Sequence, residues 1–406
     1  MKLSSGTAPK YHRPVSPLRP IHAVVLFLSA LAVRIMWVPN WDRLVFDGHE
    51  SLYRDAFLGE SVRASTQAYP LLTFLYGCLG SLSQDPRILI LFSALVGSFA
   101  VLGTAVWIGR WVEPKAGLWA GVLVCLLPEH AAWSTSAYNV VLPHALIVWA
   151  FALGGRHAML LASIAATLRI ETALLTPWLG WKGLVGGLIG AGGSLSFGME
   201  LPPGLGDSLA FDFNWPMLSY LGPPVLILSL FGLGRGKRWW LFAIALWVHG
   251  VGSAFDDYGA RHALLGGVAL CGLAASARSM WVPIIVTAGL GWNTVELAND
   301  WYAPDRGTVA AKAVDLPPPP KPCVEVSEEP ILVGQKIPSH IHFFRGTIDA
   351  ECVIWGEEFW HSQWSSRGLA DRAERMRLLY KMEPIASYKP AGGGPVRLYH
   401  RLERRW

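Results

Sequence analysis

The stretch of sequence that decides the fold is PRILILFSALVGSFAVLGTAVWIG, residues 86–109. Arg87 is its only charged residue. A helix needs about 20 apolar residues to cross the hydrocarbon core of a bilayer, and this stretch is long enough to do so. The stretch therefore predicts a membrane-spanning helix.

Comparable apolar stretches recur through the first three quarters of the chain. The first, residues 21–38, follows a basic segment and has no small-residue cleavage site near its end, so we interpret it as a retained helix rather than a signal peptide. Three runs are shorter than an ordinary span and comprise residues 70–83, 156–168 and 170–181. The remaining candidates are residues 116–133, 138–154, 183–199, 216–234, 239–255, 261–277 and 280–297.

Charged residues are scarce and unevenly distributed. Of the 406 residues, 16% are charged and 52% are hydrophobic, whereas soluble domains carry about 25% charged residues. The charged fraction is about 12% over residues 1–302 and about 27% over residues 303–406. This pattern excludes a disordered chain, a coiled coil, a collagen-like fibre and a single soluble enzyme. The net charge of +5 requires no nucleic-acid partner, because most basic residues lie in short connections between apolar stretches, as membrane topology demands.

The three short runs decide how often the chain crosses, and the positive-inside rule arbitrates between the alternatives. We place residues 70–83 at the membrane surface or as a re-entrant segment, and we let residues 156–168 and 170–181 each cross as short buried helices. The basic connections then lie on the cytoplasmic side and the acidic connections on the outer side. This predicts about eleven transmembrane helices in a bacterial cytoplasmic (inner) membrane, with the N-terminus inside and the C-terminus outside.

The predicted fold is an all-α polytopic membrane domain with a small C-terminal α/β soluble domain. Residues 1–20 form a cytoplasmic segment, and residues 21–302 form the transmembrane domain, which includes an outer acidic loop at 39–69. A proline-rich linker covers residues 303–322, because its Pro317–Pro320 run cannot continue a helix. Residues 323–406 form the extracytoplasmic domain. We find no internal repeat of the kind that many transporters contain.

Within the C-terminal domain, alternating patterns predict strands, and one amphipathic pattern predicts a helix. Its histidines lack the spacing of a metal site, so we predict no metal there. Cys323 and Cys352 either remain free or form a disulfide if this domain faces an oxidising compartment. The predicted strands are residues 323–333, 350–355 and 395–402, and the predicted helix is residues 366–382.

The outer acidic loop contains the sequence FDGHESLY, which places Asp47, His49 and Glu50 together. On a helix, Asp47 and Glu50 share one face at i,i+3. One interpretation is a capping box, in which Asp47 is the N-cap and Glu50 reaches back to it. The alternative is a catalytic pair, since carboxylates at a membrane surface serve as general bases or bind divalent cations.

Three further clusters of ionisable residues lie between apolar runs. Arg169 and Glu171 form either an internal ion pair or a cation presented to a phosphate, with Glu171 orienting it. The other two clusters are Glu129 with His130, and Asp257 with Arg261 and His262. For each of them, the alternative to a functional site is a simple surface loop or helix end. The predicted topology places all four clusters on the outer face, where carboxylates and arginines together suit a lipid-linked phosphate substrate.

The chain resembles the GT-C superfamily of polytopic glycosyltransferases, in particular bacterial members related to protein mannosyltransferases and to the aminoarabinose transferase of lipid A. The resemblance lies in an ordered set of segments across residues 21–302. These are the first helix with FDGHESLY, then YPLLTFLYGCLGSLSQDPR, GRWVEPKAGLWAGVLVCLLPEH, LRIETALLTPWLG and YGARHALLGGVALCGLAA. The loop reads DGHE where many relatives have adjacent Asp and Glu, and Arg261-His262 stands where relatives have an Arg-Tyr pair.

The resemblance implies transfer of a sugar from a polyprenyl-phosphate donor to a lipid, glycan or protein acceptor on the outer face of the membrane, with inversion. By this resemblance Asp47 is the general base, and Arg169 and Arg261 bind the phosphate. Glu50 and Glu129 orient substrate or hold a cation such as Mg²⁺ or Mn²⁺, which the sequence does not require. The alternative function is a polytopic transporter or flippase of a lipid-linked or anionic substrate.

Overall fold

The computed structural model describes fourteen stretches of the chain, and most of the residues in them are helical. The described residues are 18–36, 45–46, 70–83, 87–135, 140–196, 223–234, 236–255, 264–301, 323–326, 331–332, 341–343, 352–356, 382–388 and 396–401. The proline-rich linker predicted at 303–322 lies outside them, as does the acidic loop at 39–69 except for Val45 and Phe46.

The predicted apolar stretches form helices. In chain order these are α1 (Pro20–Met36), α3 (Pro70–Leu82), α4 (Arg87–Trp111), α5 (Pro114–Cys125), α6 (Pro128–Trp133), α7 (Val141–Leu153), α8 (Gly155–Leu168), the 3₁₀ helix η3 (Ile170–Leu179), α9 (Trp181–Ser196), α11 (Pro223–Leu230), α12 (Lys237–Phe255), α13 (Leu264–Ala275) and α14 (Trp281–Trp301). The short runs at 156–168 and 170–181 form separate helices, α8 and η3, as predicted, but the prediction that both are buried is wrong for η3, because Thr176 is its one buried residue.

The single helix predicted at 116–133 is wrong, because the structure breaks this stretch into α5 and α6. Pro128 is the first residue of α6, a position that proline favours because the missing N–H has no partner there in any helix. The break lies inside the bundle, since Leu127 is fully buried.

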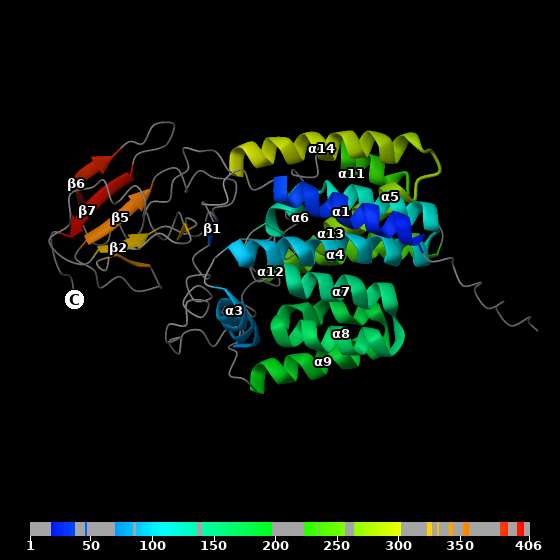
Figure 1. Cartoon of the computed structure of the whole chain (residues 1–406), viewed down its shortest axis with the longest axis horizontal. Helices are drawn as coiled ribbons and strands as arrows, with labels where there is room; N and C mark the ends of the chain where they lie inside the picture. The colour runs from blue at the N-terminus through cyan, green and yellow to red at the C-terminus, as the bar shows by residue number, and fades with distance from the viewer. Residues whose placement is uncertain are drawn as a thin grey trace, which may run out of the picture.

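Short connections make successive helices antiparallel neighbours. Gly154 joins α7 to α8 and Gly180 joins η3 to α9, with φ of 68° and 80° respectively. Both values lie in the left-handed region, which glycine adopts without steric cost. In Figure 1, α1 begins at the end of the bundle far from the strands and runs toward them.

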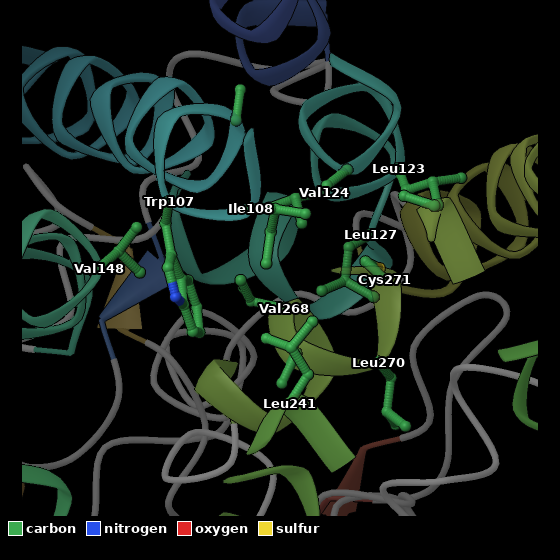
Figure 2. Packing of buried hydrophobic residues seen from close by; sticks show 14 of the residues in the cluster. Trp107, Ile108, Leu123, Val124, Leu127, Val148, Leu241, Val268, Leu270 and Cys271 are labelled. Carbon is green, nitrogen blue, oxygen red and sulfur yellow. The ribbon is translucent and has the colours of Figure 1, made fainter. Parts of the chain in front are cut away.

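The main hydrophobic core lies among α4, α5, α7, α12 and α13. Trp107 of α4 is fully buried and stacks on Phe151 of α7, with 4.5 Å between ring centroids. Figure 2 shows aliphatic side chains of α4, α5, α12 and α13 meeting around Ile108 and Val268. This core fixes the helices whose ends hold the candidate site.

The outer surface of the helices is also apolar. Exposed side chains include Met36 (80% exposed), Trp181 (70%) and Leu188 (63%). Among the described helices, one passes a test of length and composition for crossing a membrane: Ile88–Trp111, 24 residues with a mean hydropathy of 2.2. Six shorter apolar helices of 10–17 residues accompany it.

The described strands of the C-terminal part form one five-stranded sheet and one small ladder. Their bounds are β2 (Cys323–Val326), β3 (Ile331–Leu332), β4 (Ile341–Phe343), β5 (Cys352–Gly356), β6 (Met382–Tyr388) and β7 (Val396–Arg401). The sheet order is β4-β2-β5-β7-β6, with β2 parallel to both β4 and β5 and the other pairs antiparallel. Figure 1 shows the sheet beyond one end of the helical bundle.

Strands were predicted at 323–333, 350–355 and 395–402. The first is wrong in extent, because β2 and β3 are separate strands in different sheets. The helix predicted at 366–382 lies outside the described residues except for Met382, which begins β6. Cys323 and Cys352 are Cα partners in the parallel pair of β2 and β5.

The small ladder joins the two parts of the chain. β1 (Val45–Phe46), which directly precedes Asp47, pairs antiparallel with β3. Val45 is the Cα partner of Leu332, and Phe46 is the Cα partner of Ile331. A strand of the C-terminal part therefore holds the backbone next to the predicted catalytic aspartate.

Candidate functional site

The structure describes the side chains of three of the ten predicted site residues: His130, Arg169 and Glu171. Glu129 lies in α6, but its side chain is not among those described. The other predicted site residues, Asp47, His49, Glu50, Asp257, Arg261 and His262, lie outside the described residues.

Arg169 and Glu171 form an ion pair in the interior. Arg169 lies between the end of α8 and the start of η3. Its Nη2 atom is 2.8 Å from Oε1 of Glu171, and the side chains are 4% and 9% exposed. The Arg169 carbonyl accepts a hydrogen bond from the Thr172 hydroxyl at 2.8 Å. The internal ion pair, one of the two interpretations offered by the sequence, is therefore present.

His130 lies in a second cluster, where it contacts Arg34 from the last turn of α1. The Arg34 side chain is fully buried. Its Nη1 atom donates to the Ala30 carbonyl at 2.8 Å, and its Nη2 atom lies 2.7 Å from His130 Nδ1. A guanidinium has only donors, so Nδ1 is the acceptor, and the proton of a neutral His130 ring is on Nε2.

Small side chains around Arg34 leave room for this contact. Ser134, one turn after His130, donates its hydroxyl hydrogen to the His130 carbonyl. A Cβ atom at Gly97 of α4 would lie 2.3 Å from the Ser134 hydroxyl oxygen and 3.0 Å from Arg34 Nε. Glycine is therefore required at position 97 for the close approach of α1 and α6 to α4.

Two further polar residues line the cluster. The His144 ring of α7 meets the His130 ring edge to face, with 5.2 Å between centroids, and the Cys125 thiol at the end of α5 lies beside Arg34. Three nitrogens in the cluster are buried and have no hydrogen-bond partner among the described residues: Arg34 Nε, His130 Nε2 and His144 Nε2.

Both clusters lie at the same end of the bundle. α7 begins beside His130, runs away from it, and α8 returns after the turn at Gly154. Leu168, which directly precedes Arg169, packs against Leu89 at the start of α4 and Leu142 at the start of α7. Two buried arginines therefore lie near the end of the bundle that faces the β-sheet.

Our sequence reasoning missed Arg34, Ser134 and His144 and assigned Cys125 only to the core. One signal was available for Arg34, because it is the one charged residue in the apolar run at 21–38, and such a charge within a membrane span is usually functional. No comparable signal marks Ser134 or His144. Among the described residues, no group of three His, Cys, Asp or Glu side chains has metal-binding geometry.

Chemically, the Arg34 cluster is a set of hydrogen-bond donors with a fixed positive charge. Arginine remains protonated in proteins. The Glu171 carboxylate pairs with Arg169, and no carboxylate among the described residues contacts Arg34. Such a site suits an oxyanion such as a phosphate or carboxylate. Comparison of the chain with known protein families, curated proteins and solved structures finds no match.

Proposed function

We propose that this chain is an integral membrane glycosyltransferase that takes a sugar from a polyprenyl-phosphate donor on the outer face of a bacterial cytoplasmic membrane. The observation that supports it most is that the outside of the helices is apolar while charged side chains lie inside, the opposite of a soluble protein. Large apolar side chains cover the outside of the helices, whereas Arg34, Arg169 and three described histidines are inside. A soluble protein rarely exposes extended apolar surface, and buried cations at a membrane mark the binding of an anionic substrate.

The finer architecture of the proposal is about eleven crossings with a C-terminal α/β domain outside the membrane. The α5–α6 break is compatible with a crossing, because residues 114–133 together cover the length that a bilayer requires. Non-helical backbone at membrane depth is tolerated where protein surrounds it, and Leu127 at the break is buried. The opposite placement of the start of α1 and the β-sheet in Figure 1 agrees with an N-terminus inside and a C-terminus outside.

In the proposed reaction, the Asp47 carboxylate takes a proton from the acceptor hydroxyl or amine. The acceptor oxygen or nitrogen then bonds to the anomeric carbon, and the bond from that carbon to the phosphate oxygen breaks with inversion. The electron pair leaves on polyprenyl phosphate. Positioning and stabilisation of the leaving phosphate lower the barrier. Arg169 and Arg261 are the arginines that the resemblance assigns to this phosphate.

Glu50 and Glu129 are proposed to orient the substrate or to hold a divalent cation. The β1–β3 ladder supports a catalytic role for the loop, because it restrains the backbone directly before Asp47. A restrained loop lowers the entropic cost of placing the carboxylate against the acceptor.

The test compares a bacterial strain lacking this protein with strains that express the wild-type chain, Asp47→Asn or Asp55→Asn. We expect the deletion strain to accumulate a polyprenyl-phosphate sugar and the unmodified acceptor, both measured by mass spectrometry of lipid and glycan extracts. Asp55→Asn, in the same loop, should restore the wild-type pattern, and Asp47→Asn should not. Full rescue by Asp47→Asn rejects the general base.

A second assay separates the enzyme from the transporter or flippase. Detergent-solubilised protein is mixed with lipid extract from the deletion strain, which supplies the accumulated donor and acceptor. An enzyme transfers the sugar in this mixture. A transporter gives no product there, because detergent solution has no sealed compartment across which it could move the substrate. Absence of transfer in detergent, together with movement of the lipid-linked sugar across sealed vesicles, would favour the transporter.

A further inference from the structure

The Arg34 cluster has a charge and donors that the described structure does not neutralise. Burying a cation is costly unless it is paired and hydrogen-bonded. Arg34 is fully buried, yet its described side-chain contacts are a carbonyl oxygen, a neutral ring nitrogen and a thiol. Its Nε atom has no partner among the described residues.

Arg169 provides the internal comparison. It is almost as deeply buried at 4% exposed, but the Glu171 carboxylate lies 2.8 Å from its guanidinium. Its charge is therefore compensated within the chain. The same bundle end thus contains one buried arginine with a described carboxylate and one without.

The histidines beside Arg34 add two further buried nitrogens without a described partner. His130 uses Nδ1 to accept from Arg34, so its Nε2–H remains available, and Nε2 is buried without a described partner. The His144 Nε2 atom, in the ring 5.2 Å away, is also buried without one. A single ligand with several acceptor oxygens and negative charge would satisfy these atoms together.

We propose that Arg34 and His130, with His144, bind the phosphate group of a polyprenyl phosphate. The identity of the lipid rests on the proposed function, whereas the need for an oxyanion rests on the cluster itself. Arg34 lies in the last turn of α1, thirteen residues before Asp47 in the sequence. The chain thus supplies the phosphate ligand and the proposed general base from adjoining segments, and Arg34 becomes a substrate-binding residue in addition to Arg169 and Arg261.

The test measures thermal stabilisation of the full-length protein in detergent by polyprenyl phosphate, by polyprenol of the same chain length and by inorganic phosphate. The variants are Arg34→Met, His130→Gln and the control Arg110→Met. Arg110 is exposed and lies in the last turn of α4, at the opposite end of that helix from the Arg34 cluster, where it donates to the Ala152 and Leu153 carbonyls at the end of α7. We expect polyprenyl phosphate, and not polyprenol, to stabilise wild type and Arg110→Met.

Arg34→Met should weaken polyprenyl phosphate binding by at least about 10-fold, and His130→Gln by a smaller factor, since hydrogen bonds to charged groups are the stronger ones. Without ligand, Arg34→Met should be at least as stable as wild type, because an apolar side chain replaces an uncompensated charge. A merely structural arginine, paired with a carboxylate of the chain, would instead give a less stable ligand-free variant, and that result would overturn the proposal.

The remaining outcomes are also decisive. Equal stabilisation of wild type and Arg34→Met by polyprenyl phosphate rejects the site, as does the absence of stabilisation by either phosphate compound. Stabilisation by inorganic phosphate alone, lost in Arg34→Met, supports an oxyanion site and rejects the lipid. Asp47→Asn separates this inference from the proposed function: it should bind polyprenyl phosphate like wild type even though transfer is lost. Binding through Arg34 without any transfer by wild type would reject the glycosyltransferase and retain the site.

Discussion

The close contact between α8 and α9 yields a sharp prediction about packing. A Cβ atom at Gly190 of α9 would lie 2.1 Å from the Ser163 carbonyl oxygen of α8. At Gly192, two residues later in the same helix, a Cβ atom would meet nothing within 4 Å. Gly190→Ala and Gly192→Ala are therefore a matched pair: the first methyl group meets Ser163 and Ala166 of α8, with its shortest contact at the Ser163 carbonyl oxygen, and the second meets nothing within 4 Å.

The expected magnitude follows from that contact. Cβ atoms essentially never approach another atom closer than 3.0 Å, so α9 must move by about 0.9 Å to accept Gly190→Ala. Overpacking of this kind costs about 1–3 kcal/mol. The move also lengthens the bonds from the buried Ser194 hydroxyl to the carbonyls of Ala166 and Thr167, now 2.8 and 2.9 Å. Both variants gain about 1 kcal/mol of helix propensity, which cancels in the comparison.

The assay is unfolding of the purified full-length protein in detergent, followed by circular dichroism. We expect Gly192→Ala to raise the free energy of unfolding by about 1 kcal/mol and Gly190→Ala to lie about 1–3 kcal/mol below it. If the two variants agree within about 0.5 kcal/mol, which is the scatter of ordinary surface substitutions, α8 and α9 do not pack as the structure places them.

Two further predictions concern the segments around the site. The double variant Phe46→Cys with Ile331→Cys should form a disulfide under mild oxidation, because Cα partners in an antiparallel pair lie within disulfide reach. The control Val45→Cys with Ile331→Cys is one residue out of register and should not form one. Equal gel shifts for both pairs would refute the ladder. Arg169→Gln should lower the free energy of unfolding by about 3–5 kcal/mol, since it removes the guanidinium that pairs with the buried Glu171 carboxylate. Adding Glu171→Gln should recover part of that loss, and additive losses would show that the two side chains do not interact.

Apolar runs were sufficient to predict most helices, because side-chain hydrophobicity over a dozen residues is a local property. They were not sufficient to predict the break between α5 and α6. Proline is tolerated within membrane helices when neighbouring helices satisfy the freed backbone groups, so Pro128 inside an apolar run does not by itself decide between a kinked helix and two helices. In the structure the stretch forms two helices, with the buried Leu127 between them.

The strand β6 was missed for a related reason. Pro384 lies inside Met382–Tyr388, and a proline inside a run argues against a central strand because it cannot donate to the ladder. The sheet order places β6 at the edge, and its pairing with β7 shifts register between Pro384 and Ala386. Edge position and an irregular register are the conditions under which a strand accepts proline, and neither is visible from one strand alone.

In the candidate site, too, contacts between residues close in the sequence could be predicted and contacts between distant residues could not. Arg169 and Glu171 are two residues apart, so the sequence offered their ion pair as one of two interpretations, and the structure contains it. Arg34 and His130 are 96 residues apart. Only the packing of α1 against α6 brings them together, and a lone charge in the first helix is the one local trace of that contact.

The apolar exterior and the buried Arg34 reinforce each other physically. In water, an arginine at the last turn of α1 would gain hydration by turning outward, and a long flexible side chain does this readily. If lipid surrounds the bundle, the outward orientation exposes the charge to hydrocarbon, so the interior becomes the less costly place and a compensating anion becomes necessary there. The exposed Met36, two residues after Arg34, marks the apolar side of that same turn. Membrane embedding and anion binding are therefore linked proposals: if the protein were water-soluble without detergent, the physical reason for keeping Arg34 inside would disappear, and the phosphate site would lose its strongest support.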